Sequence, residues 1–220
     1  MGQEINLLDR YPKSNRPIDD RGRLITEAHR SAARQFGVEY FDGDRLSGYG
    51  GYNYHPRFWT DTVCRFRDHY QLAPDAQLLD VGCAKGFMLH DFKLFMPELL
   101  VAGVDVSGYA LERAREEVRP YLQQASADAL PFPDNSFDLV ISINTIHNLP
   151  LDRCKQSLRE IQRVSRGRAF VTMDAWRNDA ERERLLKWNL TALTYMHVDD
   201  WRRVFDEVGY TGDYYWFIAE

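Results

Sequence analysis

Short apolar runs alternate with amphipathic stretches along most of the chain beyond residue 75. Apolar runs bounded by turn residues are typical of buried parallel strands, and we expect five, at 76–82, 99–106, 121–127, 137–144 and 167–175. Helical spacing follows four of these runs, at 86–96, 108–118, 151–165 and 180–195, and appears again at 199–209. The run at 121–127 is followed by a turn at 131–136, and a final strand is expected at 212–220. This alternation predicts an α/β fold, a doubly wound and mostly parallel sheet of six or seven strands.

The first 70 residues have a different pattern. Residues 1–20 contain two prolines and many charges, and they predict a loosely attached arm. A helix is expected over 26–36, and a second over 56–72, where Pro56 suits the first helical turn. We therefore expect an arm, helix and Gly/Tyr-rich lid at 1–70 and a sheet domain at 71–220, with 176–198 as a helix on its substrate side.

Composition limits the possible partners and the compartment. The net charge is −5, which disfavours nucleic-acid binding because phosphate contacts need concentrated Lys and Arg. No apolar run approaches the roughly 20 residues of a membrane span, and charges interrupt any N-terminal signal peptide. The three cysteines, at 64, 83 and 154, are widely spaced, so we expect reduced thiols and no metal site. These features predict a cytoplasmic protein that binds neither nucleic acid nor membrane, and they leave the oligomeric state open.

The loop after the first predicted strand reads "LLDVGCAKGF". Gly82 and Gly86 flank a tight turn, where the backbone can approach a ligand and donate N–H groups at a helix start. A dinucleotide fingerprint would place glycines where this chain has Ala84 and Phe87, so the NAD pattern fails.

Two acids follow the next strands. Asp105 ends the second strand, 23 residues after Gly82, where a carboxylate can accept hydrogen bonds from ribose hydroxyls. Asp128 lies after the third strand, where it can accept the exocyclic amine of adenine while the N–H of Ala129 faces a ring nitrogen.

Together with "ASADALPFPDNSFDLV", these residues make the run Leu78–Leu149 similar to the class I S-adenosylmethionine-dependent methyltransferases, and to their type 11 group in particular. That group has an LDxGCGxG loop, an acid after the second strand and an AxxLPFxDxSFD segment. Ala84 stands where the group usually has glycine, and since it adds only a methyl group, binding should survive.

The resemblance implies S-adenosylmethionine as the cofactor and a role for each matching residue. Asp80 and the loop residues Gly82, Cys83, Ala84 and Gly86 would lie by the methionine part. Asp105 would hold the ribose, Val106 would pack on adenine, and Asp128 with Ala129 would read its edge. The backbone of Asn144 would contact the amino-acid part.

His147, in "NTIHNL", is one candidate for catalysis, as a general base or as a residue that shapes its loop. At the end of the fifth strand, "TMDAWRN" places Asp174, Trp176 and Arg177 on the substrate rim, where Arg177 can bind an anionic group or simply begin a helix. Trp188, in the helix that follows, is a substrate-wall candidate, with core packing as the alternative.

The stretch "GYGGYNYHPRFW" precedes the helix that leads into the sheet, so it can cross the cofactor edge as a lid. Tyr49 is then a cofactor contact, Tyr52 a second catalytic candidate, and Tyr54 and Arg57 substrate contacts. The alternative is a Gly-rich linker whose aromatic residues pack on the domain.

The function predicted is methyl transfer from S-adenosylmethionine to an oxygen or nitrogen of a small molecule, such as a metabolite, a sugar or a natural-product intermediate, with an acidic group possible. Two alternatives stay open. One is an enzyme of the same fold that transfers another group or cyclises the donor. The other is a non-catalytic cofactor-binding protein.

Overall fold

A computed structural model describes residues 2–12 and 18–219. Its strands form one parallel sheet in which β3, β2, β1, β4 and β5 lie side by side in that order. The outer side of β5 pairs with two strands. Its residues Phe170–Asp174 pair with β7, and Ala175 and Trp176 pair with β6. The strands are β1 Gln77–Val81, β2 Leu100–Asp105, β3 Leu122–Gln124, β4 Leu139–Ile143, β5 Ala169–Trp176, β6 Met196–His197 and β7 Asp213–Phe217.

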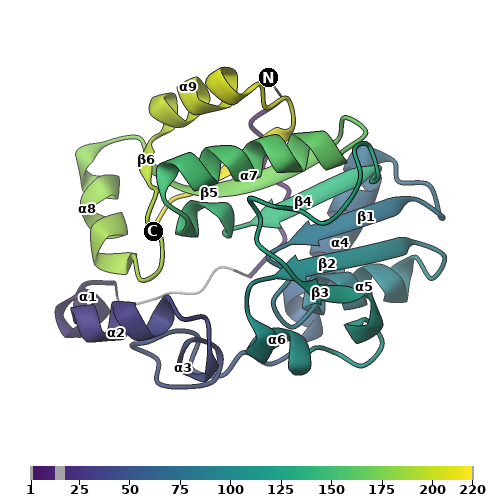
Figure 1. The fold of residues 1–220 in the computed structure, drawn as a ribbon. Helices are drawn as coiled ribbons and strands as arrows, with labels where there is room; N and C mark the ends of the chain where they lie inside the picture. The colour runs from purple at the N-terminus through teal and green to yellow at the C-terminus, as the bar shows by residue number, and fades with distance from the viewer. Residues whose placement is uncertain (1, 13–17, 220) are drawn as a thin grey trace.

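Helices cover both faces of this sheet (Figure 1). The α-helices are α1 Ile18–Leu24, α2 Glu27–Ala33, α3 Val38–Phe41, α4 Pro56–Tyr70, α5 Phe87–Phe95, α6 Gly108–Glu112, α7 Leu151–Val164, α8 Asp179–Trp188 and α9 Val198–Val208. Alternate residues of β1 serve the two faces: Leu79 and Val81 pack with α7 and α9, whereas Leu78 packs with α4 and α5. The period of two in each strand therefore builds two separate cores.

The strand order reverses at β1, which pairs with β2 on one side and β4 on the other. In open parallel sheets, ligands bind at such a switch point, outside the carboxyl ends of the strands. The segments after β1, β2, β4 and β5 therefore meet at one edge, as the sequence predicts.

The helices α1, α2 and α3 belong to an N-terminal helical segment, residues 18–55, which lies along this carboxyl edge. In Figure 1 its three helices group below α8 and beside α6. At the α8 end, Asp19 forms an ion pair with Lys187 (2.7 Å). At the α6 end, the Ser107 hydroxyl donates to the carbonyl of Phe36 (2.5 Å). The segment thus contacts the sheet domain on both sides of the switch point.

The prediction of a loosely attached arm is wrong for the described residues 2–12. The N–H of Ile5 donates to the carbonyl of Tyr214 in β7, and the N–H of Tyr214 donates to the carbonyl of Gln3. Leu7 is fully buried in the core under α4. The arm adds a short pairing to the edge of β7 and contributes to the core. Of the rest of the predicted arm, residues 18–20 belong to α1, and residues 1 and 13–17 lie outside the described part.

Two helix boundaries also differ from the sequence prediction. The helix expected over 180–195 ends at Trp188, because Asn189 folds its side chain onto Ala192 and makes a turn; its Oδ1 accepts from the Ala192 N–H and its Nδ2 donates to the Ala192 carbonyl, both at 2.9 Å. The helix expected over 108–118 stops at Glu112, and α1 and α3 are not predicted at all. Within the described residues, no helix has the length and apolar character needed to cross a bilayer.

Candidate active site

The loop after β1, residues 82–86, is called the donor loop, and it is held tightly between β2 and the segment after β4. The N–H groups of Gly82 and Cys83 both donate to the Val104 carbonyl, at 2.7 and 3.0 Å. Gly82 has φ +88°, and a Cβ there would stand 2.1 Å from the Thr145 Oγ1. Glycine at this position therefore permits both the left-handed backbone and the close approach.

Asp105 extends over this loop and orders it. Its Oδ2 accepts from the Ala84 N–H and its Oδ1 from the Ser107 N–H, both at 2.8 Å. Burial raises the pKa of the Asp105 carboxyl, and these backbone donors oppose that shift. Each carboxylate oxygen accepts more than one hydrogen bond, so Asp105 retains lone pairs for a ribose hydroxyl.

Asp80 is an acid of the site that binds no other side chain or backbone group in the described part of the chain. Its side chain is buried, and it has no hydrogen-bond or ion-pair partner among the described residues. Burial, and secondly the charge of Asp105, raise the pKa of Asp80 to about 7. A buried carboxylate without a partner favours a cationic ligand. The ammonium and sulfonium groups of S-adenosylmethionine meet that requirement, so the residues present fit this donor.

At the predicted adenine end, Val106 fits the expectation, Asp128 has an additional protein partner, and Ala129 differs. Val106 is 46% exposed, beside Asp105, and offers a free apolar surface. Both oxygens of Asp128, however, bind Arg153 of α7, at 2.5 Å to Nε and 3.0 Å to Nη2. The hydrogen bonds from Arg153 hold the pKa of Asp128 below its usual value, so it is ionised. The Ala129 N–H, expected to face the adenine ring, donates to the Ser126 carbonyl (3.1 Å).

The backbone near the predicted methionine end is strained at two positions. Ala84 has φ +48° and Asn144 has φ +51°, both in the left-handed region that non-glycine residues rarely adopt. The Asn144 N–H donates to the Thr172 hydroxyl (2.8 Å), which locks β4 to β5 at their carboxyl ends. Gly86, also left-handed, is the N-cap of α5, and Cys83 is buried.

His147 lies in a closed environment between β4 and β5. The ring is buried; its Nδ1 accepts from the Asp174 N–H (3.2 Å), and its Nε2 lies 3.5 Å from Asp174 Oδ1. Burial lowers the pKa of His147, so the ring is neutral, and Nε2 carries the proton because Nδ1 accepts. The His147 carbonyl accepts from the N–H groups of Leu193 and Thr194. This histidine therefore joins three segments of the carboxyl edge.

The four predicted lid residues divide into two groups. Tyr49 and Tyr52 pack together, with ring centroids 4.5 Å apart, and Tyr52 stacks on Phe87 at the start of α5. Tyr54 instead donates to Asp91 of α5 (2.5 Å), and the Arg57 guanidinium lies over the Phe58 ring (4.7 Å). Tyr52 and Tyr54 thus both contact Phe87 next to the loop, with ring centroids 4.9 and 5.7 Å away. Tyr49 packs on Tyr52, and Arg57 packs on Phe58.

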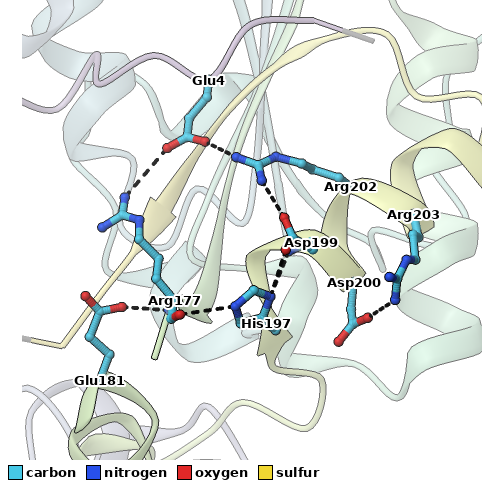
Figure 2. Close-up of polar contacts among 8 residues, drawn as sticks. All are labelled: Glu4, Arg177, Glu181, His197, Asp199, Asp200, Arg202 and Arg203. Carbon is cyan, nitrogen blue, oxygen red and sulfur yellow. Dashed lines mark hydrogen bonds and ion pairs between the residues drawn. The ribbon is translucent and has the colours of Figure 1, made fainter. Parts of the chain in front are cut away.

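The predicted rim residues after β5 face other partners. Figure 2 shows Arg177 turned toward Glu4 of the arm, 3.6 Å away, while its carbonyl lies 3.2 Å from His197 Nε2. Trp176 lies near Tyr195, with ring centroids 6.2 Å apart. Trp188 packs against Phe217 of β7 and beneath the Arg21 guanidinium of α1. Arg177 and Trp188 thus connect the arm and the helical segment to the sheet domain.

Sequence reasoning missed three charged residues of this region: Lys85, Asp42 and Arg153. Lys85 lies inside the donor loop itself, yet its partner Asp42 is 43 residues away in sequence, and nothing local identifies the pair. The cysteines are free thiols, as predicted. No cluster of metal-ligating side chains occurs among the residues described.

Comparison with known proteins identifies the family. A family model described as a methyltransferase domain matches residues 79–172. A protein of Encephalitozoon cuniculi named as a methyltransferase without a stated substrate is 30% identical over 159 residues, 64% of this chain and 71% of its own length. The 27-O-demethylrifamycin SV methyltransferase of Amycolatopsis mediterranei is 24% identical, over 76% of this chain and 69% of the relative.

Two further matches show how far the likeness reaches. The malonyl-acyl-carrier-protein O-methyltransferase of Legionella pneumophila is 29% identical over 60% of this chain, but this chain spans only 46% of that relative. The solved structure of the YcgJ protein of Bacillus subtilis aligns with a TM-score of 0.53 at 19% identity, covering 66% of each chain, and shows the shared fold. With the loop, the acids and the strand order, these matches show that the chain belongs to the type 11 group of class I S-adenosylmethionine-dependent methyltransferases.

Proposed function

We propose that this methyltransferase acts on an oxygen or nitrogen of a small molecule, and that Asp80, Asp105 and Val106 hold its donor. The observation that carries the proposal is the set of carboxylates at the carboxyl edge of the sheet, Asp80, Asp105, Asp128 and Asp174, beside the aromatic residues of the N-terminal helical segment. Phosphate backbones avoid such an acidic edge, whereas a cationic donor and a compact acceptor suit it.

The name of the Amycolatopsis relative describes methyl transfer at an oxygen of a rifamycin, which supports an oxygen acceptor on a natural-product intermediate. The N-terminal helical segment would act as the lid, since its contacts on both sides of the switch point let it exclude water from the reacting atoms. Arg177 has a carboxylate partner already, which weakens its proposed role for an anionic substrate.

Of the two roles open for His147, the geometry supports positioning of the carboxyl edge. A base must reach the proton it removes, and this ring is buried with Nδ1 already accepting a backbone N–H. His147→Ala should therefore lower the melting temperature as well as turnover. Thermal unfolding measured beside turnover tests this: a variant with unchanged stability and lost turnover would return His147 to the role of base.

One experiment tests the function. The protein is incubated with S-adenosylmethionine and fractionated small-molecule extracts, and the nucleoside products are followed by mass spectrometry. S-adenosylhomocysteine formed only with acceptor fractions supports methyl transfer, and the methylated product then identifies the acceptor atom. Methylthioadenosine as the product would show that the donor reacts in another way. An Asp80→Asn variant is the control, because its weaker donor binding should lower product formation at donor concentrations near the wild-type dissociation constant.

A further inference from the structure

An ion pair between a buried lysine and a half-buried aspartate joins the N-terminal helical segment to the donor loop. Lys85, in the loop between Gly82 and Gly86, places its Nζ 2.9 and 2.7 Å from the two carboxylate oxygens of Asp42. The two side chains are 7% and 25% exposed. A second Lys–Asp pair, Lys187 with Asp19, links the same segment to α8 at the same distance, but its side chains are 48% and 68% exposed.

Both members of the Asp42–Lys85 pair form hydrogen bonds with the backbone of one residue, Tyr52. The Asp42 Oδ1 accepts from the Tyr52 N–H (3.0 Å), and Lys85 Nζ donates to the Tyr52 carbonyl (2.9 Å). The Tyr109 hydroxyl of α6 also donates to Asp42 (2.8 Å). Burial opposes ionisation of Asp42, but these donors, Lys85 first, hold its pKa below the usual value, so the carboxylate is charged.

The ring of Tyr52 is thereby set at the donor site. It stacks on Phe87, the first residue of α5, with ring centroids 4.9 Å apart. Burial is the largest cause that raises the pKa of Tyr52, and neighbouring phenols and carboxylates add to it. The hydroxyl has no hydrogen-bond partner among the described residues and is available to a ligand.

Burying two charges costs free energy that a well-packed apolar pair would not, so a buried pair is weak evidence for stability alone. What the pair supplies is fixed geometry: the Asp42 carboxylate accepts from the Tyr52 N–H, and the Lys85 amine donates to the Tyr52 carbonyl. We propose that Asp42 and Lys85 are positioning residues that hold Tyr52 over the bound methyl donor. This inference rests on the proposed donor site.

The test is a double-mutant cycle on donor binding. Lys85→Met removes the charge and keeps most of the stem, Tyr52→Ala removes the ring, and the double variant combines them. Affinities for S-adenosylmethionine and S-adenosylhomocysteine are measured by titration calorimetry. We expect each single variant to bind about 10-fold more weakly, and the double variant to lose no more than Tyr52→Ala alone, because Lys85 acts through Tyr52.

Three controls make each outcome informative. Lys187→Met breaks the exposed pair of the same composition and should leave both affinities within about twofold of the wild type. Trypsin cleavage after Arg45 should accelerate in Lys85→Met and slow again when donor is added, a readout independent of turnover. If Lys85→Met does not fold, Asp42→Asn, which retains polar contacts to Tyr109 and Tyr52, replaces it in the cycle.

The outcomes separate the two proposals. A wild-type protein that binds neither ligand overturns the proposed donor site. A wild-type protein that binds both, with a Lys85→Met variant that binds equally well, or with losses that multiply in the double variant, overturns only the positioning role of the pair.

Discussion

Ala84 is a residue in a backbone conformation that suits glycine. Its φ of +48° is maintained by the hydrogen bond from its N–H to Asp105 and by its place in the donor loop. A non-glycine residue in the left-handed region costs roughly 1–2 kcal/mol, part of which glycine loses again through its flexibility in the unfolded chain.

We therefore expect Ala84→Gly to raise the free energy of unfolding by up to about 1 kcal/mol without weakening donor binding. Urea unfolding measures the change. The same substitution in helix α6, Ala110→Gly, is the matched control and should destabilise by about 1 kcal/mol or more. A clear loss of stability in Ala84→Gly would contradict the strain at this position.

Asp80 should favour donor binding but destabilise the ligand-free protein as the pH rises. Its pKa in the folded protein is about 7, against a usual value of 3.8, so the folded state holds the proton more tightly than the unfolded chain. The contribution of Asp80 to the free energy of unfolding is fully present below about pH 4 and is lost as the pH rises to about 7. Asp80→Asn cannot ionise, so it avoids this loss.

We expect Asp80→Asn without ligand to be more stable than the wild type at pH 8, by up to roughly 4 kcal/mol, with the difference shrinking toward pH 4. The same variant should bind S-adenosylmethionine at least tenfold more weakly, since the donor's ammonium loses its carboxylate. Thermal unfolding across pH and calorimetry measure the two effects. Asp61→Asn, on the exposed side of α4, is the control and should change neither.

At the scale of elements, the arm carries a testable packing contribution. Leu7 is fully buried under α4, whereas its neighbour Leu8 is half-buried. Leu7→Ala should lower the free energy of unfolding by about 2–5 kcal/mol, as buried leucines generally do, and Leu8→Ala should cost about half as much or less. Urea unfolding of the pair measures the difference. Equal and small losses would mean that the arm is loose after all.

The strands and long helices could be predicted because their pattern is local. The runs that form β1, β2, β4 and β5 are short, apolar and bounded by turn residues, and α4 begins at the predicted Pro56. The attachment of the arm could not be predicted, since one buried leucine among charged residues gives no repeating hydrophobic pattern. The overextended helix after Asp179 contains apolar residues at helical spacing, yet the side chain of Asn189 closes a turn that spacing alone does not reveal.

The candidate site divides in the same way. The sequence identifies Asp105 and Gly82 because their spacing follows the strands, and the structure brings both to one edge. The backbone of Tyr52 is bound by Asp42 and Lys85, whose separation in sequence hides them. The positions of Tyr54 and Arg57 depend on packing against α5 and on Phe58. Tertiary contacts between charged residues are the part that local patterns do not contain.

For the whole molecule, donor binding should appear as added stability, because a ligand that binds only the folded state stabilises it. At 100 times its dissociation constant, S-adenosylhomocysteine should add about 2.7 kcal/mol and raise the melting temperature in proportion to the logarithm of its concentration. NADH, whose fingerprint the loop lacks, should give no shift. At the same S-adenosylhomocysteine concentration, a tenfold weaker affinity in Asp80→Asn should reduce the added stability to about 1.4 kcal/mol. An unshifted wild type would contradict a donor site at this edge.

The pairing of the arm with β7 also has a consequence for synthesis of the chain. Gln3 and Asp213 are 210 residues apart in sequence, and the N–H of Gln3 donates to the Asp213 side chain. At about 5–20 residues per second on the ribosome, the arm waits about 10–40 seconds for its partner strand to be made. Throughout that interval the apolar side chain of Leu7 lacks its finished core and is open to chaperones. Residues 2–12 thus reach their native place only after β7 has been made.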